Sequence, residues 1–245
     1  MFNKNKNVQE LDEYGVTVLK SVYKPDEMLE LYELSQKIHK EAVDYISKNP
    51  KYDNYKYYTH FEKERCSVKK NYEIENLDIL EIVKGRYDIN CKKFNKKVNS
   101  KITDIVKNFI SKQYTVNWGL LTSDVNSNDG PWHRDVVNID GESDEYGNYD
   151  DSNMVHNFQP FYYTILIPLV SLDKHNGTPE FILGSHKLTY SESIKSEHVR
   201  LDTNLGDVII FDGRIFHRGC ANNSDKARPV LYNVIKRNWY VETGE

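Results

Sequence analysis

The second half of the chain alternates short apolar runs with turn signals, and this alternation limits the possible folds more than any other feature. From residue 114 onward the runs are "YTVNWGLLT", "FYYTILIPLV", "PEFILG", "DVIIFDG" and "RPVLYNVIKRNWY". Turn-forming pairs such as Asn176-Gly177 and Asp212-Gly213 separate them. Short runs rich in β-branched and aromatic residues, bounded by such turns, predict a succession of strands. This succession favours a β-barrel or a jelly roll.

The first 113 residues predict a mainly helical layer. The segment "YGVTVLKSV" (14–22) predicts an opening strand because it is rich in β-branched residues. A helix should then begin at Pro25, which acidic residues follow, and end before Pro50. A second helix is predicted over residues 93–111. Helices followed by strands indicate the α+β class, so we expect a jelly-roll core with the N-terminal helices packed on one sheet.

A chain of 245 residues suits one domain. We expect residues 1–113 to form its helical part and residues 114–240 its jelly-roll core. Residues 138–160 are too polar for the core, and a long loop between strands is typical of a lid over a functional site. This loop is acidic and has no Lys or Arg, which suits either a lid over a cationic substrate or a solvated surface loop.

Composition narrows the class of partner. The formal net charge of −4 gives no reason to expect nucleic acid or an anionic membrane as the main partner. No apolar stretch approaches the length of a membrane span, and the first residues lack the apolar core of a signal peptide. The three cysteines show no Cys-x-x-Cys spacing, which indicates reduced thiols. We therefore expect a soluble, cytoplasmic protein that acts on a small molecule.

Three residues form a candidate metal site. His133 and Asp135 are two residues apart, and in a strand this spacing puts both side chains on one face, about 6–7 Å apart. His217 ends a distant apolar run. Two histidines and one carboxylate are the set that holds Fe(II) on three facial positions and leaves the others open for substrate and O2. Arg228, eleven residues after His217, is a fixed bidentate donor suited to a carboxylate-bearing co-substrate.

Three blocks of the sequence resemble a known family. The blocks are "WHRD" (132–135), "NGTPEFILGSHK" (176–187) and "GDVIIFDGRIFHRGCANNSDKARPVLY" (206–232). They are similar to the signature blocks of the phytanoyl-CoA dioxygenase-like family of Fe(II)- and 2-oxoglutarate-dependent oxygenases. The resemblance implies a double-stranded β-helix, a cupin-like jelly roll.

The resemblance also implies roles for individual residues. His133, Asp135 and His217 would be the iron ligands, and Arg228 would pair with the distal carboxylate of 2-oxoglutarate. Thr164, in "YYTIL", would offer its hydroxyl to the co-substrate. Gly219 stands where the family often has a serine that touches 2-oxoglutarate, so that hydrogen bond should be missing or come from elsewhere.

The activity implied is hydroxylation of a C–H bond of a small molecule, with release of succinate and CO2 from 2-oxoglutarate. A carboxylate at Asp135 favours hydroxylation, desaturation or ring closure, because relatives that halogenate lack it. Two alternatives remain open: a non-catalytic jelly-roll protein that binds a metabolite, and a cupin-like metalloenzyme that does not use 2-oxoglutarate. Intact candidate ligands argue against the first, and Arg228 argues against the second.

Overall fold

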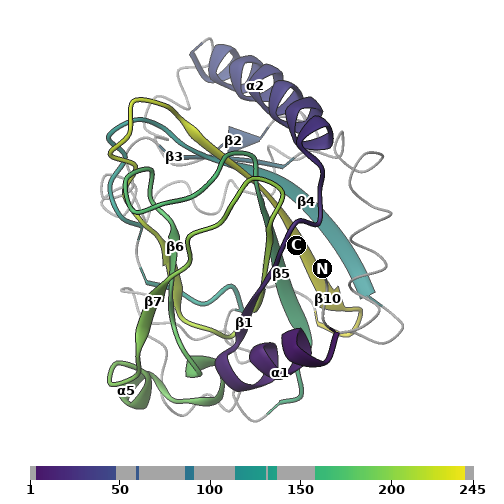
Figure 1. Cartoon of the computed structure of the whole chain (residues 1–245), viewed down its shortest axis with the longest axis vertical. Coiled ribbons are helices and arrows are strands. Elements are labelled where there is room, and N and C mark those ends of the chain that lie inside the picture. Colours follow the sequence, from purple (N-terminus) through teal and green to yellow (C-terminus); the bar gives the residue numbers. More distant parts are fainter. Residues whose placement is uncertain are drawn as a thin grey trace.

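The computed structural model describes residues 4–47, 59–60, 86–90, 114–130, 132–136 and 158–240. Within these residues, two sheets face each other (Figure 1). The larger sheet has the strand order β1-β8-β5-β10-β4-β3-β2 and the smaller has the order β7-β6-β9. This is the jelly-roll architecture in the α+β class that the sequence predicts.

The larger sheet joins the start of the chain to its end. Its strands are β1 (Val16–Leu19), β2 (Thr59–His60), β3 (Arg86–Asn90), β4 (Tyr114–Ser123), β5 (Tyr162–Pro168), β8 (Val208–Asp212) and β10 (Arg228–Arg237). The pairing is antiparallel between all neighbours except β2 and β3, which are parallel. The opening strand predicted from the sequence therefore forms, and it pairs with β8 rather than with a strand near it in sequence.

The smaller sheet consists of β6 (Pro179–Ile182), β7 (His198–Arg200) and β9 (His217–Gly219). It packs on the larger sheet through a buried apolar cluster in which Phe181 of β6 meets Ile209 and Phe211 of β8. A 3-10 turn (Ser185–Lys187) and the short helix α5 (Tyr190–Ser193) connect β6 to β7. The space between the two sheets is where the candidate ligands converge.

The N-terminal helices cover the outer face of the larger sheet. Helix α2 (Pro25–Ser47), which begins at Pro25 as predicted, buries Met28, Leu31, Ser35 and Ile38 on one face. Three of these side chains share one core with Leu120 of β4 and with residues of β5, β8 and β10. Helix α1 (Lys4–Tyr14) adds Leu11 to the same core and runs beside β1 (Figure 1).

The predicted helix over residues 93–111 and all but the end of the 138–160 loop fall outside the described residues. Some elements of the structure also differ from those that the sequence predicts. The sequence does not predict helices α1 and α5 or strands β2, β3, β7 and β9, because α5 and these strands are short and α1 is largely polar.

Asp207 stabilises the connection between β1 and α2 through hydrogen bonds. Its buried carboxylate accepts hydrogen bonds from the backbone N–H of Ser21 (2.8 Å) and of Asn204 (3.0 Å), and from the Lys20 ammonium (2.9 Å). Burial alone would raise the pKa of Asp207, but these donors together hold it below its ordinary value. The carboxylate therefore stabilises the folded state in its charged form.

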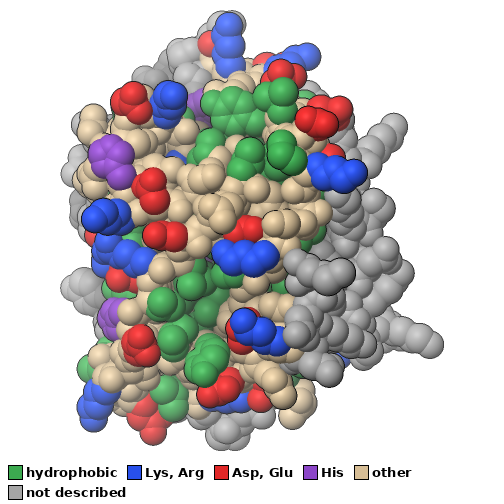
Figure 2. All heavy atoms as spheres, viewed as in Figure 1, with side chains coloured by type: hydrophobic (Ala, Val, Ile, Leu, Met, Phe, Trp, Pro, Cys, Tyr) green, Lys and Arg blue, Asp and Glu red, His purple; other side chains and the backbone are tan. Residues whose placement is uncertain are grey.

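Charges of both signs are mixed on the surface. Figure 2 shows Lys and Arg side chains interspersed with Asp and Glu over one face, with apolar side chains gathered between them. Within the described ranges, no helix has the length and apolar character that a membrane crossing requires.

Candidate metal centre

A direct backbone bridge brings the two candidate histidines together. The N–H of His133 donates to the carbonyl of His217, and the N–H of His217 donates to the carbonyl of His133, both at 3.0 Å. In such a pair two side chains stand next to each other on the same face. The imidazole ring centroids are 4.3 Å apart. Two hydrogen bonds thus fix residues from distant parts of the sequence as neighbours.

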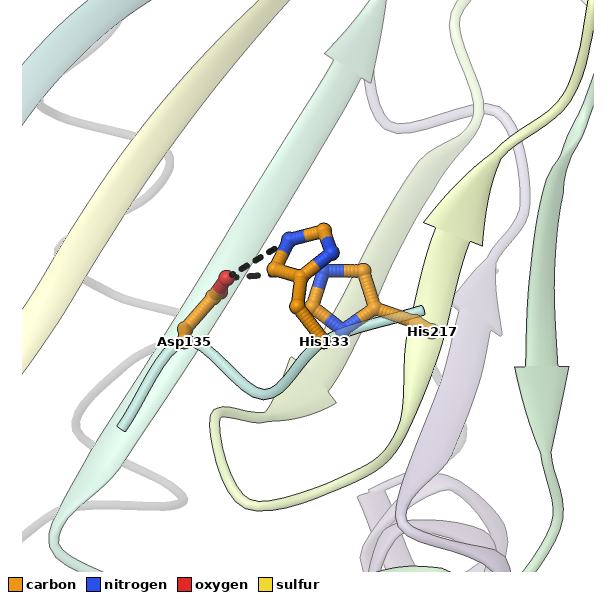
Figure 3. Close-up of side chains that lie close together, drawn as sticks. All are labelled: His133, Asp135 and His217. Carbon is orange, nitrogen blue, oxygen red and sulfur yellow. Dashed lines mark ion pairs between the residues drawn. The ribbon is translucent and has the colours of Figure 1, made fainter. Parts of the chain in front are cut away.

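Asp135 completes the cluster from the same short segment. Its backbone N–H donates to the carbonyl of Gly213 at 2.9 Å, which ties the segment to the turn after β8. Its Oδ1 lies 3.6 Å from Nε2 of His133 and 3.4 Å from Nε2 of His217 (Figure 3). One ligand atom from each residue can be chosen so that all lie within 4.8 Å of one another.

The segment that carries His133 and Asp135 is not a regular strand, the conformation in which their spacing would place both side chains on one face. Only His133 forms a β-bridge, and Asp135 lies in a bend. The alternation of side chains nevertheless persists. Arg134 points away from the cluster, where its guanidinium donates to the carbonyls of Ser185 (3.0 Å) and Leu188 (2.8 Å). The intervening residue thus anchors the segment while its two neighbours face the site.

The environment of His217 sets both its charge and its tautomer. Its ring packs against Phe181 and Phe211, with ring centroids 5.8 and 4.5 Å away. Burial lowers the pKa of His217 to about 4, although the negative charge of Asp135 opposes the shift. Its Nδ1 lies 3.1 Å from the carbonyl of Ile215, which can only accept, so Nδ1 carries the hydrogen. The Nε2 lone pair therefore faces Asp135 and His133, as a metal ligand requires.

Arg228 lies at the start of β10, as predicted, and its side chain is buried. It stands directly opposite Ser123 of β4 in the sheet register. Its guanidinium donates to the Ser123 hydroxyl at 2.7 Å and to the Gly177 carbonyl. These contacts hold the planar donor group in a fixed orientation inside the jelly roll. The sequence did not indicate Ser123, because only strand pairing brings it to Arg228.

Thr164 of β5 contacts the candidate metal site. Its hydroxyl donates to Oδ2 of Asp135 at 2.5 Å, and the residue is 4% exposed. The contact with 2-oxoglutarate that the resemblance implies stays a prediction. His186 lies outside the metal cluster. Its Nε2 lies 3.0 Å from the Asp12 carbonyl, and the ring is buried at the turn after β6.

Some side chains on the inner faces of β5 and β10 are less buried than those on the outer faces. Along β10, Leu231 and Ile235 are buried under the helices, whereas Tyr232 and Val234, whose side chains point the other way, are half-buried. Leu166 of β5 is half-buried on the inner face too. These side chains form a partly apolar wall within the jelly roll.

A charge network supports the outer side of β9. Glu180 of β6 accepts hydrogen bonds from Arg218, the residue after His217, at 2.7 Å and from Arg200 of β7 at 3.4 Å. Burial would raise the pKa of Glu180, but Arg218 and then Arg200 hold it below its usual value. The guanidinium of Arg218 also lies 4.8 Å from the ring centre of Trp132, the residue before His133. This network therefore connects the strands and segments that carry both histidines.

Comparison with known proteins agrees with this arrangement. The family model for phytanoyl-CoA dioxygenase (PhyH) matches residues 11–230. The chain belongs to the phytanoyl-CoA dioxygenase family. The match includes His133, Asp135, His217 and Arg228, and it confirms the resemblance noted in the sequence.

Solved structures of low sequence identity share the fold of this family member. The non-heme alpha ketoglutarate dependent epimerase SnoN from nogalamycin biosynthesis has a TM-score of 0.66 at 12% identity, over 96% of this chain and 82% of that one. HygX from Streptomyces hygroscopicus was solved with nickel, 2-oxoglutarate and hygromycin B bound. It has a TM-score of 0.62 at 11% identity, over 99% of this chain and 90% of that one.

A curated relative matches a shorter region. Dioxygenase peniF from Penicillium patulum is 35% identical over 72 residues, which are 29% of this chain and 23% of that protein. The match spans about a quarter of that relative, so the family assignment rests on the model match over residues 11–230.

Proposed function

We propose that this member of the phytanoyl-CoA dioxygenase family is a non-haem Fe(II)- and 2-oxoglutarate-dependent dioxygenase that hydroxylates a C–H bond of a small molecule. The observation that carries the proposal is the convergence of His133 Nε2, Asp135 Oδ1 and His217 Nε2 between the two sheets. Two imidazoles and one carboxylate are the donor set that suits Fe(II) with open positions. Membership of an oxygenase family supports this use of the set.

Each residue has a distinct task in this proposal. His133, Asp135 and His217 would hold the iron, which would supply the oxidative chemistry that converts 2-oxoglutarate, O2 and a substrate C–H bond to succinate, CO2 and a C–OH group. Arg228 would bind the distal carboxylate of 2-oxoglutarate, held in place by Ser123 and Gly177. The burial of Arg228 supports this task, because a guanidinium shielded from water binds a carboxylate more strongly.

A small-molecule substrate is supported by proteins of the same fold. SnoN has been solved with Fe3+, alpha ketoglutarate and nogalamycin RO, and HygX with nickel, 2-oxoglutarate and hygromycin B. Neighbours of the same fold also include an epimerase and the carbocyclase SnoK. Removal of a hydrogen atom from the substrate followed by epimerisation or ring closure is therefore the second candidate outcome at this site.

Anaerobic titration tests the proposed cofactors directly. Fe(II) is added to metal-free protein, then 2-oxoglutarate, and the visible charge-transfer band of the chelated iron is followed. We expect the band in the unaltered protein, and its loss in His217→Ala and Asp135→Ala because the iron is no longer held. His175→Ala serves as the matched control, since His175 is an exposed histidine in the turn before β6.

The outcomes separate the alternatives. A band that requires His217 and Asp135 supports the oxygenase, and succinate release in air then supports turnover. Iron binding without a band on addition of 2-oxoglutarate would favour the metalloenzyme that does not use this co-substrate. Failure to bind either would favour a non-catalytic jelly roll.

A further inference from the structure

The two oxygens of the Asp135 carboxylate have different surroundings. Oδ1 faces the two imidazoles, at 3.6 and 3.4 Å from their Nε2 atoms. Oδ2 accepts the hydrogen bond from the Thr164 hydroxyl at 2.5 Å. One oxygen is thus turned toward the position between the ligand atoms, and the other is held by a strand of the larger sheet.

Thr164 is a rigid donor. Its strand is paired on both sides, opposite Val234 of β10 and Phe211 of β8. A β-branched side chain in a strand has few accessible rotamers, and burial restricts this one further. Asp135, by contrast, lies in an irregular segment whose backbone is tied to Gly213. The orientation of the carboxylate therefore depends on Thr164 more than on its own backbone.

We propose that Thr164 is a positioning residue, which holds Asp135 so that the carboxylate binds iron through Oδ1 alone. This inference rests on the proposed function, because it concerns the same metal site. A carboxylate can bind a metal through one oxygen or two. If Asp135 used both, it would take one of the three positions that 2-oxoglutarate, as a chelate, and O2 need. A hydroxyl that donates to Oδ2 keeps that position open.

This assignment replaces the direct contact between Thr164 and 2-oxoglutarate. A threonine hydroxyl has a single hydrogen, and the carboxylate and keto oxygens of 2-oxoglutarate are acceptors only. The hydrogen that is given to Asp135 is not available to the co-substrate. The two roles therefore predict different behaviour when 2-oxoglutarate is absent.

The test measures Fe(II) affinity of metal-free protein without oxygen and without 2-oxoglutarate, by competition with a chelator. Thr164→Val keeps the shape of the side chain and removes the hydroxyl, and we expect it to weaken Fe(II) binding about 10- to 100-fold, the usual effect of losing a group that orients a metal ligand. Thr164→Ser keeps the hydroxyl and should recover most of the affinity. The charge-transfer band at saturating iron should then need more 2-oxoglutarate in Thr164→Val.

Thr122→Val is the matched control. Its hydroxyl is fully buried on β4 and has no hydrogen-bond partner among the described residues, so its loss should leave Fe(II) affinity unchanged. Thermal melting of the three variants without metal checks that each is folded.

Several results would overturn the inference. One is an Fe(II) affinity in Thr164→Val equal to that of the unaltered protein, and another is a Thr164→Ser variant as weak as Thr164→Val. A defect that appears only when 2-oxoglutarate is added would assign the hydroxyl to the co-substrate instead. If the unaltered protein bound no Fe(II), the proposed function itself would fail, and the inference with it.

Discussion

Replacing Arg228 should separate co-substrate binding from metal binding. Arg228 does not belong to the cluster of His133, Asp135 and His217, and its guanidinium is held instead by Ser123 and Gly177. Arg228→Lys keeps the positive charge but loses the planar fork that can donate two parallel hydrogen bonds to one carboxylate. Arg228→Ala loses the charge as well.

The size of the effect follows from the hydrogen bonds lost. A hydrogen bond to a charged group contributes about 1.5–3 kcal/mol. Loss of one such bond in Arg228→Lys should weaken 2-oxoglutarate binding about 10- to 150-fold, at about 1.4 kcal/mol for each factor of ten. Arg228→Ala should weaken it further. Fe(II) affinity should stay within about threefold of that of the unaltered protein in both variants, since Arg228 is not one of the proposed iron ligands.

The same substitutions also affect the fold. Arg228→Ala leaves the Gly177 carbonyl and the Ser123 hydroxyl without this buried donor. The free energy of unfolding should fall by about 1–3 kcal/mol for each group that finds no other partner. Thermal melting without ligands therefore accompanies the binding assay. Ser123→Ala removes one of these contacts and leaves the guanidinium in place, and it should weaken 2-oxoglutarate binding less than Arg228→Lys.

The assay is the anaerobic titration of 2-oxoglutarate into the Fe(II)-loaded variants, with the half-saturation of the charge-transfer band as the readout. Arg200→Lys is the matched control, because Arg200 lies on β7 with its side chain 47% exposed. The reasoning is refuted if both Arg228 variants are folded, bind iron, and take up 2-oxoglutarate with the affinity of the unaltered protein.

Three further predictions concern the scaffold. Gly119→Ala should displace the Tyr232 ring, because a Cβ at Gly119 would overlap its Cζ, and quenching of tyrosine and tryptophan fluorescence by acrylamide should show the change. Glu180→Gln should reduce the free energy of unfolding by about 1–2 kcal/mol, measured with urea, because the charged hydrogen bonds to Arg218 weaken. Asp207→Asn should lower the free energy of unfolding at pH 7. The difference from the unaltered protein, measured with urea, should shrink as the pH falls below about 4. The lowered pKa of Asp207 means that its contribution is present above the pKa of the unfolded chain and is lost as the native carboxylate is protonated.

Much of the fold could be predicted because it depends on local signals. The strands β4, β5, β6, β8 and β10 follow apolar runs between turns, and α2 follows the spacing of Met28, Leu31 and Ile38. The elements that the sequence does not predict include β2, β3, β7, β9, α1 and α5, whose residues have no strong local pattern. Strand β9 spans only His217–Gly219, and its pairing partners, Phe181 and His133, lie far away in the sequence.

The sequence alone determined which groups are available for chemistry. It supplies two histidines, a carboxylate and an arginine in an order that resembles one oxygenase family. The spacing of His133 and Asp135, with Arg134 between them, predicts that the outer two side chains share a side. These are local properties, and they hold even though the segment is a bend rather than a regular strand.

Only the tertiary structure decided how these groups meet. The bridge between His133 and His217, the pairing of Arg228 with Ser123 and the hydrogen bond from Thr164 to Asp135 each join residues from distant segments. Strand register sets such contacts, and register depends on the packing of two whole sheets rather than on any local run. The sequence therefore predicts which residues are the candidate ligands. The fold sets their orientation and determines which oxygen of Asp135 faces the two imidazoles.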